Sequence, residues 1–173
     1  MACSEKVWIG PNYSYRRIFV LGESWYGDYT DDLVTDDGYI RAYLADCQSD
    51  SMYSRIANAC MDDKSLRARR DYWHGVMFTN FVQRVGATRD SRPTAEHYRD
   101  ACGRLARLLE ECTPRGVWIL GLEQSRYSAP VVQRAGIAYE VSAHPTSYGL
   151  RNATLGASWK ALVTKAKACA PAQ

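Results

Sequence analysis

Four short runs of the chain are apolar at nearly every position, and the segments between them carry apolar residues at helical spacing. Continuous apolar runs are typical of strands that are buried on both faces, as in a parallel sheet covered by helices. The runs predict four strands, at residues 17–22, 75–82, 116–122 and 136–144.

The clearest helical pattern spans residues 93–112, where apolar positions recur at intervals of three or four. Pro93 and Thr94 provide a start signal for this helix, and Pro114 lies just beyond its end. Weaker patterns predict further helices at 129–136 and 157–169, and two or three between residues 39 and 73.

The alternation of strands with helices predicts an α/β fold. We expect residues 1–173 to form a single domain, a three-layer α/β/α sandwich around a central, mainly parallel four-stranded sheet. In sheets of this kind, ligands bind beyond the carboxyl ends of the strands. Polar loops occupy those ends and read GESWYGD, TNF, GLEQ and HPTS, so the sequence predicts a functional site at this edge.

The overall composition excludes some classes of protein and leaves others open. Hydrophobic residues make up 46% of the chain, which is enough for a core, and no apolar run approaches the roughly 18–20 residues that span a bilayer. The first residues lack the apolar stretch of a secretion signal, so we expect a cytoplasmic protein without membrane contact. The net charge of +3 permits a polyanionic partner without requiring one.

The six cysteines do not have the spacing of zinc or iron–sulfur sites. We therefore expect free thiols in a reducing compartment, and neither a metal ion nor another cofactor. The candidates for chemistry are the polar side chains of the four loops.

The loop after the first predicted strand combines acidic with aromatic residues. Gly22 lets the backbone turn sharply off the strand. Candidate bases or water-holding groups follow at Glu23, Ser24 and Asp28. Candidate surfaces for stacking are Trp25 and Tyr26.

Two further polar residues stand at the ends of predicted strands. Asn80 lies among apolar residues, and its amide can donate and accept at once, which suits the edge of a nucleobase or, alternatively, a local turn. His144 is followed by Pro145, which pushes the histidine backbone into extended space and aims its imidazole from the sheet edge. The alternative for His144 is a structural histidine that bonds backbone groups.

Taken in order, these segments resemble the motifs of the uracil-DNA glycosylase superfamily. The matching segments are VLGESWYGD at 20–28, FTNFVQRVGATRDSRPTAEHYRDAC at 78–102, VWILG at 117–121 and HPTSYGL at 144–150. The greatest likeness is to a divergent branch with a Gly-Glu-Ser-aromatic first motif. The resemblance covers most of the chain from Arg17 to Trp159.

The resemblance implies a monomeric DNA glycosylase that flips a target base and hydrolyses its N-glycosidic bond, leaving an abasic site. In this reading His144 stabilises the departing base and Asn80 recognises it. Glu23, or else Asp28, positions the water and stabilises the sugar cation. The aromatic platform for the base comes from Trp25, Tyr26 or Tyr39.

The loop after His144 would then contact the DNA. Tyr148 or Leu150 is the candidate wedge that fills the vacated stack of bases. Thr146, Ser147 and Arg151 are candidates for phosphate contacts.

Two positions depart from the superfamily pattern. Ser24 stands where the best-known members carry the Asp or Asn that holds the catalytic water, and Trp25 stands where they carry proline. These departures favour a modified or damaged pyrimidine as the target, such as a hypermodified base of phage DNA in antiviral defence, over uracil in base-excision repair, which is the other possibility. Ser24 also favours an alternative, a non-catalytic nucleic-acid-binding relative, and a hydrolase of free nucleosides or nucleotides is a third possibility.

Overall fold

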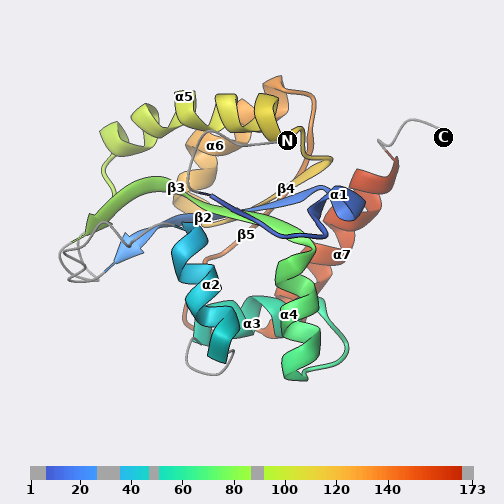
Figure 1. The fold of residues 1–173 in the computed structure, drawn as a ribbon. Helices are drawn as coiled ribbons and strands as arrows, with labels where there is room; N and C mark the ends of the chain where they lie inside the picture. Colours follow the sequence, from blue (N-terminus) through green and yellow to red (C-terminus); the bar gives the residue numbers. More distant parts are fainter. Residues whose placement is uncertain (1–6, 27–35, 47–50, 87–91, 169–173) are drawn as a thin grey trace.

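The computed structural model describes residues 7–26, 36–46, 51–86 and 92–168 (Figure 1). Within them the chain forms five strands and seven helices. The strands are β1 (Trp8–Ile9), β2 (Ile18–Tyr26), β3 (Val76–Gly86), β4 (Gly116–Leu120) and β5 (Ala138–Ser142). The helices are α1 (Tyr13–Arg16), α2 (Asp36–Asp46), α3 (Ser51–Cys60), α4 (Leu66–His74), α5 (Ala95–Cys112), α6 (Leu122–Arg134) and α7 (Asn152–Ala168).

The strands form one sheet in the order β1-β3-β2-β4-β5. The strands β3, β2, β4 and β5 run parallel, and they are the four that the apolar runs predict. β1 is antiparallel to β3, with Trp8 opposite Phe78. The prediction of four strands was therefore wrong, since the sheet is mixed and has five. β1 leaves no signal in the sequence because two residues are too few to display a hydrophobic period.

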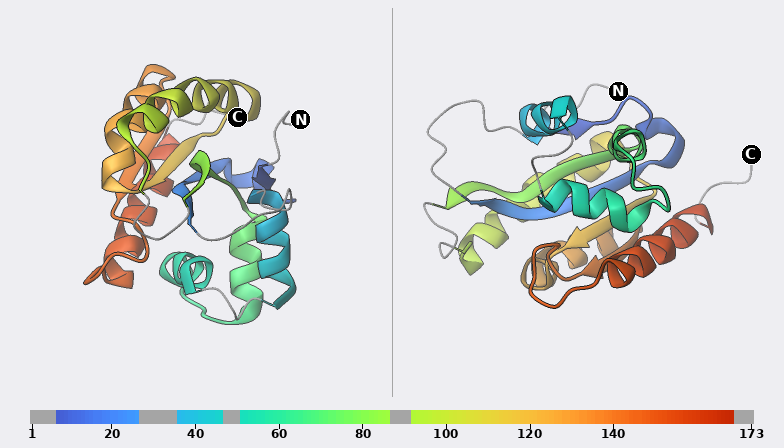
Figure 2. Two further views of the ribbon diagram at one scale, coloured as in Figure 1. Left: turned by 90° about the vertical axis from the view of Figure 1, so that its left-hand side faces the viewer. Right: turned by 90° about the horizontal axis from the view of Figure 1, so that it is seen from below.

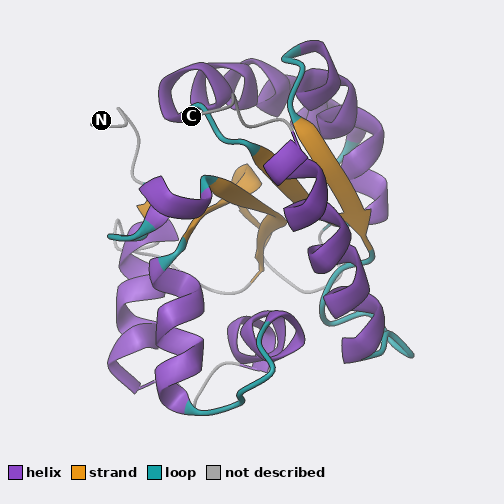
Figure 3. Ribbon diagram, turned by 90° about the vertical axis from the view of Figure 1, so that its right-hand side faces the viewer, coloured by secondary structure: helices purple, strands orange, loops and turns teal. Residues whose placement is uncertain are grey.

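Helices cover both faces of the sheet (Figures 1 and 2). Val20 of β2 belongs to a core cluster shared with α2, α3, α4 and α7. Its neighbours Phe19 and Leu21 belong to a second cluster, shared with α5 and α6. Successive strand residues point to opposite faces, so the unbroken apolar run of β2 supplies both layers at once. Figure 3 shows the strands enclosed between these helices.

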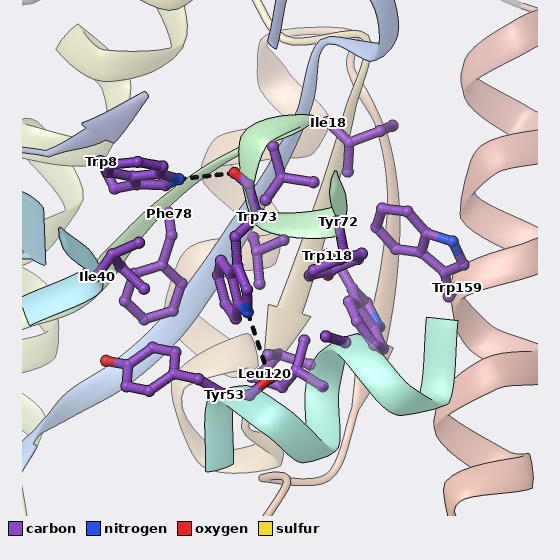
Figure 4. Packing of buried hydrophobic residues seen from close by; sticks show 14 of the residues in the cluster. Trp8, Ile18, Ile40, Tyr53, Tyr72, Trp73, Phe78, Trp118, Leu120 and Trp159 are labelled. Atoms are coloured by element: carbon purple, nitrogen blue, oxygen red, sulfur yellow. Dashed lines mark hydrogen bonds between the residues drawn. The ribbon is translucent and has the colours of Figure 1, made fainter. Parts of the chain in front are cut away.

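The first cluster is built around Trp73 of α4 (Figure 4). Its backbone carbonyl accepts a hydrogen bond of 2.8 Å from the indole of Trp8, and its own indole donates to the carbonyl of Tyr53 at 3.4 Å. The Tyr53 ring also lies 5.5 Å from that of Phe78, edge to face. These contacts hold α3 against the sheet, and α3 supplies part of the candidate site described below.

Helix boundaries follow capping groups that the sequence pattern reveals only in part. α5 begins after Thr94 as predicted, where the Thr94 hydroxyl accepts from the His97 N–H and the His97 ring accepts from the Thr94 N–H. α6 begins at Leu122, seven residues before the predicted start, and passes through Pro130. The sequence pattern predicted a helix over residues 129–136 only, but the helix begins directly after β4, with Gly121 as its N-cap.

None of the described helices has both the length and the apolar character needed to cross a lipid bilayer. Cys60, Cys102 and Cys112, the three cysteines in the described ranges, are free thiols. This agrees with the expected reduced state for those three.

Candidate active site

A cleft of about 860 Å³ opens at the carboxyl edge of the sheet. Its lining includes Glu23 from β2, Asn80 from β3 and His144 from the loop after β5. The predicted candidates from three separate strands therefore meet in one cleft, as the parallel topology requires. α2 and α3 add Tyr39, and also Tyr53, to the same cleft.

Gly22 allows β2 and β3 to approach each other beside the cleft. The two strands pair Gly22 with Asn80, and a Cβ atom at Gly22 would lie 2.3 Å from Asn80 Oδ1. β2 continues past Gly22 to Tyr26, so the glycine does not turn the chain off the strand as predicted. It provides space for the asparagine side chain instead.

Replacing Gly22 with alanine is expected to lower the free energy of unfolding by about 1–3 kcal/mol, because the added methyl group overlaps the Asn80 amide. Urea denaturation would measure the change. Gly103→Ala is the matched control: it lies in α5 with no atom within 4 Å of the added carbon, so it should stabilise by roughly 0.5–1 kcal/mol. Equal stability of Gly22→Ala and the parent protein would contradict the steric role.

Asn80 is held in place by hydrogen bonds to Asp36, the first residue of α2. Asp36 is fully buried, and its carboxylate accepts from Asn80 Nδ2 at 3.1 Å and from the Asn80 backbone N–H at 3.2 Å. The Thr79 hydroxyl and Gln83 Nε2 also donate to this carboxylate. Burial raises the pKa of Asp36, while these hydrogen bonds and the charge of Arg104 act in the opposite direction.

The Asp36 contact determines which end of the Asn80 amide a ligand meets. Since a carboxylate only accepts hydrogen bonds, the amide nitrogen faces Asp36. The amide oxygen therefore lies on the other side, over Gly22. Asn80 lines the cleft and presents an acceptor there, which suits a ligand with an N–H donor.

Glu23 is nearly buried and is oriented by α5. The Tyr98 hydroxyl donates to Glu23 Oε1 at 2.7 Å. The Tyr98 ring stacks between Phe81 and Tyr127, with centroid distances of 6.2 and 5.1 Å. The sequence pattern treats Tyr98 only as an apolar position of α5, so the role of its hydroxyl was missed.

His144 is held by the loop that follows it. Its Nδ1 lies 2.8 Å from the Thr146 hydroxyl and accepts the Thr146 backbone N–H at 3.3 Å. Because a backbone N–H can only donate, Nδ1 is the acceptor and the ring proton belongs on Nε2. Burial lowers the pKa of His144, the charge of Arg92 lowers it further, and the charge of Glu23 opposes both. The ring is therefore neutral at pH 7 and has one N–H to donate.

Aromatic rings form one wall of the cleft. The rings of Trp25 and Tyr39 lie 4.9 Å apart, and those of Tyr39 and Tyr53 lie 5.4 Å apart. Trp25 Nε1 and the neighbouring Ser24 hydroxyl are buried without a hydrogen-bond partner in the described part of the chain. Both residues line the cleft. For Tyr26, only its backbone position at the end of β2 is described.

The two candidate wedge residues have different surroundings. Tyr148 is fully exposed at the rim of the cleft. Leu150 packs against the first core cluster, and its carbonyl accepts from Arg55. Of the two, Tyr148 has the freedom to enter another molecule.

The three residues predicted to bind phosphate also differ in their surroundings. Thr146 is exposed, but its hydroxyl contacts His144. The Ser147 backbone N–H donates to the His144 carbonyl at 2.8 Å, and Ser147 lines the cleft. Arg151 is exposed just beyond the loop. Asp28, the second candidate for the water-positioning role, lies outside the described residues.

Sequence reasoning missed several residues of this site. Asp36 stands beside Asp37 and has the ordinary pattern of acids in the first turn of a helix. Tyr53 and Met52 lie in a segment whose helices have weak signals. Only the tertiary fold brings these residues to the cleft, so no local pattern could have identified them.

No three His, Cys, Asp or Glu side chains in the described ranges gather as a group that could hold a metal ion. Compared with known proteins, the chain matches no protein-family model and no curated protein sequence. Function must therefore be argued from the geometry of the cleft.

Proposed function

We propose that this protein is a DNA glycosylase, which flips a target base out of DNA and hydrolyses its N-glycosidic bond. One observation carries the proposal: Glu23, Asn80 and His144 converge on a single cleft that has an aromatic wall and an exposed tyrosine at its rim. The same residues carry the resemblance of the sequence to the uracil-DNA glycosylase superfamily.

The reaction breaks the bond between C1′ of the sugar and the base nitrogen, and the bonding electrons leave with the base. A neutral His144 supports this step, because its Nε2–H can donate to a base oxygen as negative charge develops there. A hydrogen-bond donor already oriented by the loop needs no reorganisation when the charge appears.

Recognition of the base would combine an acceptor with a stacking surface. Asn80 presents its amide oxygen, which suits the N–H edge of a pyrimidine. Trp25 and Tyr39, whose rings are tilted by 53° to each other, provide aromatic faces, one of which could stack against an extruded base. The cleft of about 860 Å³ stands near the upper end of the roughly 300–1,000 Å³ of small-molecule sites, which favours a modified base over a plain pyrimidine.

Glu23 would supply the remaining chemistry. Its carboxylate can orient a water molecule toward C1′ and accept the proton that the water loses as the new C1′–O bond forms. The same negative charge favours the oxocarbenium-like sugar. The hydrogen bond from the Tyr98 hydroxyl holds the carboxylate in one orientation at the cleft.

A base-release assay tests the proposal. Purified protein would be incubated with DNA containing uracil, thymine mismatches, hydroxymethylated or glucosylated cytosine, and released bases and abasic sites would be measured. We expect release from one substrate, lost in Glu23→Gln, which retains an acceptor for Tyr98. Glu123→Gln changes an exposed carboxylate of the same cleft and should retain activity.

The other outcomes of this assay assign the rival functions. Salt-dependent DNA binding without release of any base would indicate a non-catalytic nucleic-acid-binding relative. Hydrolysis of free nucleosides with no affinity for DNA would indicate a nucleotide enzyme. Either result would reject the glycosylase.

The pH dependence of base release should reflect the environment of His144. Its pKa is lowered below the ordinary 6.5, so the folded protein takes up this proton only at more acidic pH. Protonation would place two donors, Nδ1–H and the Thr146 N–H, against each other. We expect a constant rate above pH 6.5 and a decline only below it, measured under single-turnover conditions. A decline that begins above pH 7 would contradict the assignment.

Tyr148 and Leu150 should respond differently to alanine substitution. Tyr148→Ala is expected to slow base release from duplex DNA about tenfold without affecting stability, because the side chain is fully exposed in the described structure. Leu150→Ala is expected to reduce stability, because Leu150 packs against the core. Thermal denaturation together with base release distinguishes the two roles, and equal behaviour of the two variants would count against Tyr148 as the wedge.

A further inference from the structure

A second pocket, of about 290 Å³, lies at the opposite edge of the sheet. It is bordered by Arg16 at the end of α1, by Ile18 at the start of β2, by Arg115 just before β4, and by Trp159 and Lys167 of α7. α1 and α7 both lie on this side of the molecule (Figure 1), and residues of both line the pocket. Ile18 and Trp159 form part of its apolar floor at the margin of the core cluster (Figure 4).

The pocket is separate from the candidate active site. Ile18 is the first residue of β2, and Glu23 follows five positions later in the same strand. At roughly 3.3 Å per residue the two pockets are about 17 Å apart along the strand. No residue is shared by their linings.

Three cations border this pocket, and none of the described residues that line it is acidic. Within the described ranges, no ion pair involves any of the three, Arg16, Arg115 and Lys167. The Cys60 thiol also borders the pocket, and because burial raises its pKa it is neutral at pH 7 and adds no negative charge. Among the described residues, the positive charges around the pocket are therefore not neutralised by an acidic side chain.

Arg115 carries the strongest indication of a missing partner. Its Nε atom is buried and has no hydrogen-bond acceptor in the described part of the chain. A buried donor without an acceptor is costly, and such a donor is normally satisfied by protein, water or a bound ion. Arg115 lines the pocket, so an anionic group bound there would lie beside its guanidinium group and would also face Arg16 and Lys167.

We propose that this pocket is a second binding site, for a small anionic molecule with an apolar body, such as an aromatic phosphate or carboxylate. The anionic group would bind to the three cations, and the ring would pack over Ile18, Val163 and Trp159. This site does not depend on the glycosylase proposal, because it uses none of the residues of the first cleft.

Isothermal titration calorimetry of the full-length protein tests the site with phenyl phosphate and benzoate as probes. We expect saturable binding of at least one probe with a dissociation constant below about 1 mM, the range in which a single small site is measurable. Inorganic phosphate lacks the aromatic ring, and benzyl alcohol lacks the anionic group. Each of them should therefore bind at least tenfold more weakly. Inorganic phosphate that binds as tightly as phenyl phosphate would overturn the role of the apolar floor.

Substitutions test whether the probe binds in this pocket. Arg115→Gln is expected to weaken the probe at least tenfold, and Lys167→Gln, an exposed change at the end of α7 that leaves the core intact, about threefold. Arg67→Gln removes an exposed arginine of α4 and is the matched control, which should bind as the parent does. His144→Ala should also bind normally, which separates this site from the first cleft. No saturable binding, or binding unchanged in both Arg115→Gln and Lys167→Gln, would reject the proposal.

Discussion

His144→Ala is expected to slow base release about 100- to 1,000-fold, the loss seen when one donor that stabilises a developing negative charge is removed. Single-turnover kinetics would measure the change. The effect should appear in the rate of bond cleavage, because His144 is proposed to act on charge that is absent from the bound substrate. Affinity for DNA should stay within a few-fold of that of the parent protein.

The hydrogen bond to the His144 ring explains why the loss should be large. The Thr146 N–H fixes Nδ1 as the acceptor, so alanine removes the one N–H that the ring can offer to the base. His144→Gln returns an N–H donor at a similar distance and should recover part of the lost rate. Alanine and glutamine variants that are equally slow would argue that the imidazole has a structural role, which is the alternative that the sequence left open.

Asp36→Ala is expected to lower the free energy of unfolding by about 3 kcal/mol, because it removes the carboxylate that accepts from the buried backbone N–H and side-chain amide of Asn80 and from the Thr79 hydroxyl. Urea denaturation would measure the loss. The same substitution frees the Asn80 amide to rotate, so base recognition should weaken together with stability.

Asp37→Ala is the matched control for Asp36→Ala. Asp37 is the next residue of α2, and its carboxylate forms an exposed ion pair with Arg41 at 2.8 Å. Exposed pairs of this kind contribute little, so the control should change stability by less than about 0.5 kcal/mol. A loss below about 1 kcal/mol in Asp36→Ala would mean that water satisfies the donors and that Asp36 does not hold Asn80.

The sequence correctly indicated the four parallel strands, the start of α5 and the edge of the sheet at which polar residues gather. Each of these depends on local information: an apolar run of strand length, a capping threonine after a proline, and a polar residue next to a strand end. In a parallel sheet the carboxyl ends of the strands lie at one edge, whatever the side-chain contacts are. For this reason the sequence could predict that Glu23, Asn80 and His144 lie near one another.

Other features depend on partners that are distant in the chain. Gly22 is needed because Asn80, on the neighbouring strand, occupies the space of a side chain, and nothing near Gly22 in the sequence indicates this. Tyr98 and Asp36 become part of the site only through contacts with Glu23 and Asn80 across the fold. Leu150 could not be distinguished from Tyr148 as a wedge from the sequence, because only the fold packs Leu150 against the core and leaves Tyr148 fully exposed.

The sequence alone therefore determined the class of fold and the strand ends that hold the principal polar residues, because hydrophobic periodicity is a local property of the chain. The tertiary structure alone decided the orientation of the Asn80 amide, the tautomer of His144 and the second cationic pocket. Hydrogen bonds and charges act between atoms that are near in space, and residues such as Arg16, Arg115 and Lys167 come near one another only when the chain has folded.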